Sequence, residues 1–404
     1  MEIPSENSGS SLRIIAVHGG AGFHARSQLS DGEIKKALRT SCVRALAVLT
    51  RGEKALQGVV EAIKVLEDEE CLNAGYGSNL TLSGYVECDA SVMDGNTGDF
   101  GAVGAVRGVK NPVALAHEVL QHSRMPDPLG RIPPLLLVSA GAEDLARIRG
   151  LTCPPESMIA PRATLEWQKW KALLEAAQAA STQAVTLTPD SCADGLRDRQ
   201  DTVGAVALDG ASLTAAGVSS GGLLLKQPGR IGESIEYSLQ AAIYGAGCWA
   251  TPHTACSVSG AGEYITRLAL ARTVCEAVEA AGDDRDTHSI LNTIIGEQFH
   301  HPAPTGVCLQ RGETSPQAGV LLLVKELDND GHQKRRCDST LSADRPSHPL
   351  APSKPVFGAP SRRRVWRSDT PLAPRPSPAY VPTPIYNLEA WSGQLIRRRR
   401  LPRQ

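Results

Sequence analysis

The chain has 404 residues, with 42 Lys and Arg against 43 Asp and Glu, so its formal net charge at pH 7 is only −1. Hydrophobic residues make up 41% of it, which is ordinary for a globular protein with an ample core. Such a balance gives no reason to expect nucleic-acid binding, and no apolar run reaches the length of a membrane span. The acidic, polar start lacks the pattern of a signal peptide, so we expect a cytoplasmic or nuclear protein.

The first half of the chain alternates between strand and helix patterns. Asn111 and Pro112 open one helix, as a cap followed by a proline at the first helical position. Alternating or continuous apolar runs predict strands at residues 12–18, 85–93, 100–106 and 133–138. Apolar residues at helical spacing predict helices at about 31–49, 56–66, 143–149 and 164–180.

The second half begins after a polar, weakly patterned stretch, 181–200, which ends at Asp201-Thr202. We predict strands at 203–208, 213–218 and 320–324, and one long helix at 263–280. Beyond about residue 330 the chain is rich in Pro and Arg and is not expected to fold. The predicted division is therefore 1–201 and 202–330 as two halves of one layered α/β domain, then a low-complexity tail at 331–404.

Thr202 is the first candidate for chemistry. A threonine hydroxyl is a poor nucleophile without a base beside it. Cleavage of the Asp201–Thr202 bond would supply that base, because an α-amine has an ordinary pKa of about 7.7–8.0. The alternative is that Thr202 only begins a strand, where β-branched residues are favoured.

Two segments further on could serve acyl transfer. Ser259-Gly260 offers hydroxyl and backbone donors for a developing oxyanion, and Arg230 could hold a carboxylate in a bidentate grip. Each has an ordinary structural explanation when taken alone, as a strand serine, a turn glycine or a surface arginine. The spacing and order of the motifs decide between the two interpretations.

These motifs resemble the plant-type asparaginase superfamily of N-terminal nucleophile hydrolases, over roughly residues 12–325. The resemblance implies a four-layer αββα sandwich and self-cleavage before Thr202. It also implies an αβ heterodimer that can pair into a dimer of heterodimers. The segments that carry it are His18–Gly22, Asn73–Asn79, Glu87–Gly95, Thr202–Val206, Ser219–Gly222, Pro228–Gly232, Tyr244–Trp249 and Ser257–Glu263.

Within that superfamily the chain is most similar to the threonine aspartases (taspases), which cut protein substrates after aspartate. Asp201 stands where ordinary asparaginases have glycine, and Ser219-Ser220 stands where they have Ser-Thr. The resemblance implies that Thr202 is both nucleophile and base and that Ser220 assists it. It further implies that Arg230 binds the substrate aspartate, that Ser259 and Gly260 stabilise the oxyanion, and that Asn73 lines the site.

One departure concerns the residue that follows Arg230 in the site. Asparaginases have an aspartate three residues past this arginine, which grips the α-amine of a free amino acid. Glu233 has that spacing here, but we interpret Glu233–Leu239 as an insertion and Gln240 as the true equivalent.

Two alternatives to the aspartate-directed endopeptidase stay open. One is an L-asparaginase or isoaspartyl aminopeptidase on the same fold. The other is a non-catalytic interaction protein that is never processed and that binds through its basic tail. No cofactor and no metal site is expected.

Overall fold

The computed structural model describes residues 12–20, 31–182, 202–231, 240–282, 286–299, 318–327, 333–341 and 388–389. In this part the strands form two sheets, of order β11-β1-β5-β6-β2-β3-β4 and β10-β9-β8-β7. The strands of the larger sheet are β1 Ile14–His18, β2 Cys88–Asp94, β3 Phe100–Val106, β4 Leu136–Val138, β5 Val203–Leu208, β6 Thr214–Ser220 and β11 Leu388–Glu389. Those of the smaller sheet are β7 Cys248–Ala250, β8 Thr254–Gly260, β9 Ala318–Leu327 and β10 Gln333–Leu341.

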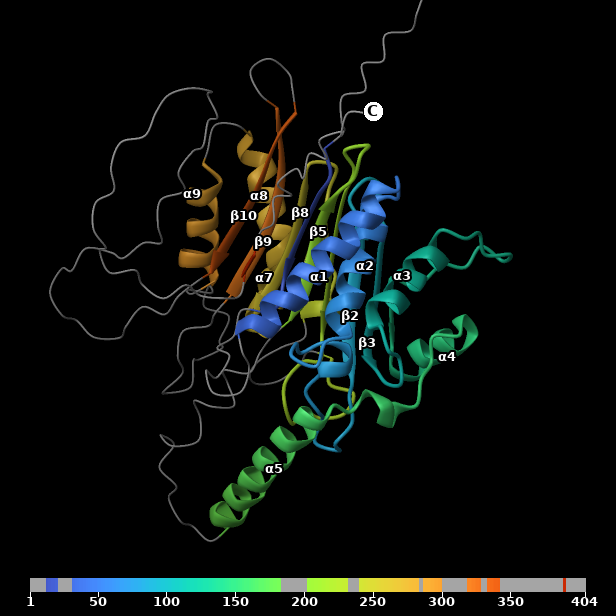
Figure 1. Ribbon diagram of the computed structural model, residues 1–404, viewed down its shortest axis with the longest axis vertical. Coiled ribbons are helices and arrows are strands. Elements are labelled where there is room, and N and C mark those ends of the chain that lie inside the picture. Colours follow the sequence, from blue (N-terminus) through green and yellow to red (C-terminus); the bar gives the residue numbers. More distant parts are fainter. Residues whose placement is uncertain are drawn as a thin grey trace, which may run out of the picture.

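Helices cover the outer face of each sheet, which gives the four layers of an αββα sandwich (Figure 1). The larger sheet carries α1 Asp31–Thr50, α2 Ala55–Glu67, α3 Pro112–Ser123 and α4 Ser139–Arg149. The smaller sheet carries α7 Gly262–Leu268, α8 Leu270–Ala281 and α9 Thr287–Thr293. Short helical turns lie at η1 Gly75–Gly77, η2 Pro155–Met158, η4 Gln240–Ala242 and η6 Ile294–Phe299. Helix α5 Pro161–Thr182 extends away from these layers (Figure 1).

The core falls into two large clusters of buried apolar side chains, one on each face of the larger sheet. Strands β5 and β6 are buried along their whole length, because helices cover one face and the second sheet covers the other. Their continuous run of small and apolar residues, in place of an alternating pattern, is what burial on both faces requires.

The predicted helix at 263–280 is wrong in one respect, because it is two helices. Ala269 separates α7 from α8 with a left-handed φ of 45°. The break lets the first amides of α8 bond outside the helix, with Ala271 N–H donating to Ala246 O and Arg272 N–H donating to Gly245 O. Tertiary hydrogen bonds thus override a sequence of strong helix formers.

Other boundaries also differ from the sequence prediction. Strand β4 begins only at Leu136, after Pro133-Pro134, because proline has no N–H to give to a ladder. Strand β2 begins at Cys88, three residues later than predicted. Strand β10 lies beyond residue 330, where the sequence predicted no further strand, and it pairs antiparallel with β9.

The helix cap predicted at Asn111 does not form, and no membrane-spanning helix is found in the described part of the chain. Asn111 stands before α3, but its side chain makes no cap hydrogen bond; the Glu67 carboxylate accepts the Val113 N–H in its place at 2.9 Å. Among the described helices, none combines the length and apolar character needed to cross a membrane.

Candidate active site

Strand pairing brings the predicted nucleophile to the predicted assisting serine. In the antiparallel β5–β6 pair Val203 lies opposite Ser219, which places Thr202 opposite Ser220. Both residues are buried, with Thr202 only 4% exposed. The Oγ1 of Thr202 donates a hydrogen bond to the Oγ of Ser220 at 3.1 Å.

Asn73 contacts the segment that follows Ser220. Its carbonyl accepts the Gly221 N–H at 2.9 Å, and its Nδ2 donates to Gly222 O at 2.8 Å. The Gly222 N–H in turn donates to the Oγ of Ser220 at 3.1 Å. A Cβ on Gly221 would lie only 2.5 Å from the Asn73 Oδ1, so this close approach requires glycine. Asn73 thus shapes the turn beside Ser220, as a residue lining the site would.

Ser259 reaches the same end of the molecule from the second sheet. Strand β8 begins near Thr214, at the far end of β6, and Ser257 on β8 donates to Gly217 O in the middle of β6. Ser259 lies two residues further along β8, so its side chain is on the same face as that of Ser257. This places it level with the start of β5. Its Oγ is buried and has no hydrogen-bond partner within the described part of the chain. Gly260 ends the strand, with a φ of 136°.

His18 ends β1 and lies opposite Gly204 of β5, and the sequence marks it only as part of a motif. Its Nε2 is 2.8 Å from the Oγ of Ser257. Because that hydroxyl gives its hydrogen to Gly217 O, we infer that Nε2 carries the imidazole proton. Burial lowers the pKa of His18 to about 4, while a hydrogen bond with the Thr202 backbone raises it. The imidazole is therefore a neutral link between the two sheets.

Arg230 forms an ion pair that sequence reasoning did not anticipate. Its Nη2 lies 2.5 Å from the Oε1 of Glu263, at the beginning of α7. Both side chains are largely buried, at 11% and 14% exposure, and charge-assisted contacts of this kind are strong. The guanidinium is thus held by a carboxylate of the protein itself.

Two buried carboxylates flank the end of β6, and neither was predicted. Ser219 donates to the Oε1 of Glu67 at 2.6 Å, and burial raises the pKa of Glu67 to about 8. Asp89 lies opposite Ser220 on β2, and burial raises its pKa to about 6 although Lys226, 3.9 Å away, lowers it. Sequence patterns show such carboxylates only as polar residues in an apolar strand or helix.

Three predicted features cannot be placed. Asp201, Glu233–Leu239 and the side chain of Gln240 lie outside the described residues; the Gln240 backbone begins η4. Within the described ranges, no three His, Cys, Asp or Glu side chains gather as a metal site.

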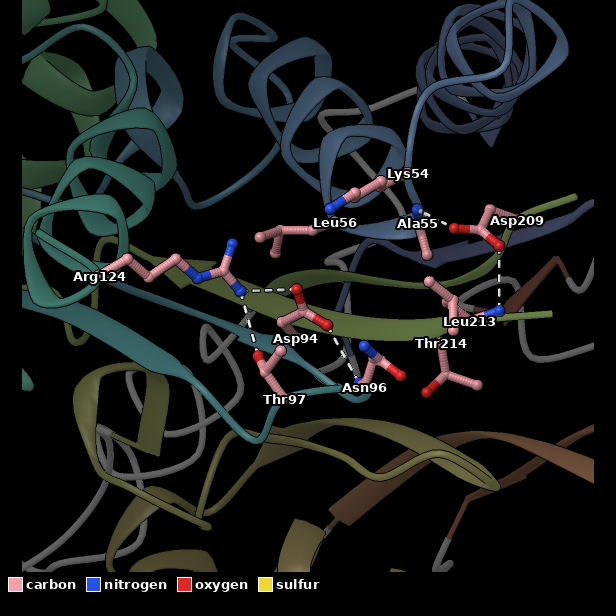
Figure 2. Close-up of a pocket in the computed structure, with 10 residues that line it drawn as sticks. All are labelled: Lys54, Ala55, Leu56, Asp94, Asn96, Thr97, Arg124, Asp209, Leu213 and Thr214. Carbon is pink, nitrogen blue, oxygen red and sulfur yellow. Dashed lines mark hydrogen bonds and ion pairs between the residues drawn. The ribbon is translucent and has the colours of Figure 1, made fainter. Parts of the chain in front are cut away.

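A pocket of about 140 Å³ opens at the opposite end of the larger sheet (Figure 2). The carboxylate of Asp209 there accepts N–H groups of Ala55, Ala211 and Leu213, and Arg124 pairs with Asp94. None of the predicted site residues lines this pocket. Its charged side chains of both signs hold the loops at this end together, so it is not the candidate active site.

Comparison with known proteins agrees with the geometry. A family described as asparaginase matches residues 11–306. The plant-type L-asparaginase of Pyrococcus furiosus is 36% identical over 296 residues, which cover 73% of this chain and 89% of that protein. The isoaspartyl peptidase/L-asparaginase of Danio rerio is 36% identical, over 65% of this chain and 75% of its own. The isoaspartyl peptidase of Escherichia coli is 34% identical, over 67% and 78%.

The family match spans most of the chain and includes Thr202, Ser220 and Ser259. The four-layer fold points to the same group. The chain therefore belongs to the asparaginase family, in the plant-type asparaginase and isoaspartyl peptidase superfamily of N-terminal nucleophile hydrolases.

Proposed function

We propose that this protein hydrolyses the side-chain amide of asparagine or the amide bond of a β-aspartyl peptide, with Thr202 as nucleophile. The observation that carries the proposal is the 3.1 Å hydrogen bond from Thr202, immediately before β5, to Ser220. A nucleophile at that position becomes a chain end as soon as the preceding peptide bond is cut. Its α-amine then lies beside its own hydroxyl and supplies the missing base.

The reaction follows from these groups. The Thr202 hydroxyl gives its proton to the α-amine and attacks the acyl carbon, and the oxyanion that forms accepts a hydrogen bond from Ser259. The α-amine passes the proton to the leaving nitrogen as the carbon–nitrogen bond breaks. Water then attacks the acyl-threonine ester by the same route, which releases the acid and regenerates the hydroxyl. A single oxyanion donor contributes about 3–4 kcal/mol to such steps.

The substrate class is supported by the relatives and by Arg230. Relatives with 34–36% identity are named L-asparaginase or isoaspartyl peptidase. Arg230 is a suitable partner for a substrate carboxylate, since guanidinium binds carboxylates in a fork geometry. The ion pair with Glu263 fixes one Nη of this guanidinium. After self-cleavage we expect an αβ heterodimer, with dimers of heterodimers as the larger assembly.

One observation favours a second candidate, an endopeptidase that cuts protein substrates after aspartate. The residue before Thr202 is Asp201, so a chain that cleaves itself there accepts aspartate on the acyl side. The same Arg230 would then bind the side-chain carboxylate of that aspartate. A polypeptide has no α-amine to grip, which agrees with the interpretation of Gln240 as the residue that follows in the site.

Denaturing gels of the purified protein give the first test. Two fragments that meet at Asp201/Thr202, and a single intact chain for Thr202→Ala, are expected of an enzyme. A wild-type chain that stays intact and inactive would instead favour the non-catalytic interaction protein.

A substrate panel then separates the two activities. Release of ammonia from L-asparagine, or of amino acids from β-aspartyl dipeptides, is the expected result. Cleavage of aspartate-containing peptides with no turnover of these small substrates would replace the proposed function by the endopeptidase.

A further inference from the structure

The loop that carries Arg230 is built as a tight turn. Residues Gln227 to Arg230 close a turn in which the Arg230 N–H donates to Gln227 O at 3.1 Å. Pro228 stands at its second position and Gly229, with a φ of 74°, at its third, which is the pattern of a type II turn. In such a turn the N–H of the third residue is not used by the turn itself and needs an outside acceptor.

Glu87 supplies that acceptor and also holds the other end of the loop. Its Oε2 accepts the Gly229 N–H at 2.8 Å, next to Arg230 in the chain. Its backbone carbonyl accepts a hydrogen bond from the ammonium group of Lys226 at 2.7 Å. One buried residue therefore binds the loop at two points, through its side chain and through its backbone.

Glu87 is itself fixed by Arg107. The Nε and Nη2 of Arg107 both donate to the Oε1 of Glu87, at 2.8 and 2.5 Å. Arg107 also stacks over the ring of Tyr85, 5.2 Å from its centroid. The two carboxylate oxygens of Glu87 thus have different hydrogen-bond partners: Oε1 accepts from Arg107, and Oε2 accepts from the turn. A carboxylate is needed for both, because it accepts on each oxygen and donates on neither.

We propose that Glu87, held by Arg107, is a positioning residue that orients Arg230 toward the substrate carboxylate. This inference rests on the proposed function, in which Arg230 binds that carboxylate. Glu87 touches neither substrate nor nucleophile; it acts by setting the position of the Gly229–Arg230 peptide. Glu263 then fixes the direction of the side chain from that point.

The kinetic test uses each substrate that the wild-type enzyme cleaves, paired with its analogue in which the recognised carboxylate is a carboxamide. We expect Glu87→Gln to raise KM more than it lowers kcat. Its preference for the carboxylate substrate, as a ratio of kcat/KM values, should fall on the order of tenfold to a hundredfold. Glu87→Asp, which keeps the charge, should recover part of that preference. An unchanged preference in Glu87→Gln would overturn the proposal.

The matched control is Asp209→Asn. Asp209 is also a buried loop carboxylate that accepts backbone N–H groups, but it lies at the far end of the sheet (Figure 2). It should lose stability and keep the preference, which separates a positioning role from general destabilisation.

Hydrogen exchange gives a measurement that needs no activity. The amides of residues 226, 227 and 229–231 should exchange at least about tenfold faster in Glu87→Gln than in wild type, with little change in β5 and β6. Equal exchange rates would overturn the proposal even if kinetics changed. If the wild-type enzyme cleaves none of the substrates in the panel, the proposed function is wrong. The exchange rates would still decide whether Glu87 holds the loop.

Discussion

The two ends of the larger sheet are both rich in buried polar groups, but they use them differently. At the far end, Asp209 accepts three backbone N–H groups and Arg124 joins Asp94 and Asp99. At the end with Thr202, the buried Ser259 Oγ has no hydrogen-bond partner in the described part, and the buried Asp89 Oδ2 faces Lys226 Nζ at 3.9 Å without a hydrogen bond. A buried polar atom without a hydrogen-bond partner costs free energy, so the position of the Ser259 Oγ agrees with the oxyanion role proposed for it.

The strongest test of this contrast exchanges one threonine at each end for alanine. Thr202→Ala removes the proposed nucleophile and should lower activity on the order of 10⁴-fold or more, with no self-cleavage. Thr214→Ala removes a hydroxyl that donates to Thr251 O at the far end. It should keep self-cleavage and turnover while it lowers the free energy of unfolding by about 1 kcal/mol. Steady-state kinetics and urea unfolding measure both, and a catalytic defect in Thr214→Ala would break the comparison.

A second pair of variants compares two serines on one strand. Ser259→Ala should lower kcat by about 10²–10³-fold through loss of an oxyanion donor. It should not lower stability, because the hydroxyl that it removes has no partner among the described residues. Ser257→Ala breaks contacts with His18 and Gly217 and should be clearly destabilising. A Ser259→Ala enzyme with normal kcat would remove Ser259 from the mechanism.

A substitution at the far end of the larger sheet should change stability and leave activity unchanged. Asp209→Ala leaves three N–H groups without their acceptor, including that of Ala55 in the first turn of α2. We expect the free energy of unfolding to fall by about 1–3 kcal/mol. The kcat of the folded enzyme should stay within about twofold of wild type, since distant sites behave independently. Initial rates measured well below the melting temperature check this.

The smallest effect is a change in how stability depends on pH. Burial raises the pKa of Glu67 from 4.5 to about 8, so between these values the unfolded chain loses a proton that the folded chain keeps. The stabilisation is therefore complete below pH 4.5 and is lost as pH rises toward 8. Glu67→Gln resembles the protonated acid and should flatten this slope. Urea unfolding at several pH values, in the Thr202→Ala background where one chain unfolds, measures it; an unchanged slope would rule out Glu67 as its source.

Much of the fold could be predicted from sequence, because long periodic or continuous apolar runs determine it. The strands around Thr202 and the helices α1 to α5 lie close to their predicted ranges. The break at Ala269 could not be predicted, since Leu268-Ala269-Leu270 favours a helix and only the loop at Gly245-Ala246 ends it. The same holds for the hydrogen bond from Val113, at the start of α3, to Glu67, which ends α2 and lies 46 residues earlier in the chain.

The candidate site divides in the same way. Thr202, Ser220, Ser259 and Asn73 were identified from motifs, and the structure brings Thr202 to Ser220 and Asn73 to the turn after it. The carboxylates Glu67, Glu87 and Asp89 were missed as site elements, because a single carboxylate in an apolar strand or helix has no periodic signal. Only the register of β2 and β6 shows that Asp89 faces Ser220.

The order of the strands has a consequence for the protein after a cut before Thr202. Strands β5 and β6 follow the cut in the chain, yet they lie between β1 and β2, which precede it. The two polypeptides would then share the larger sheet, with strands of one hydrogen-bonded between strands of the other, and neither would contain all of that sheet. Their separation would be the same event as unfolding, so the pair should resist dilution and, once apart, should not reassemble from two preformed halves.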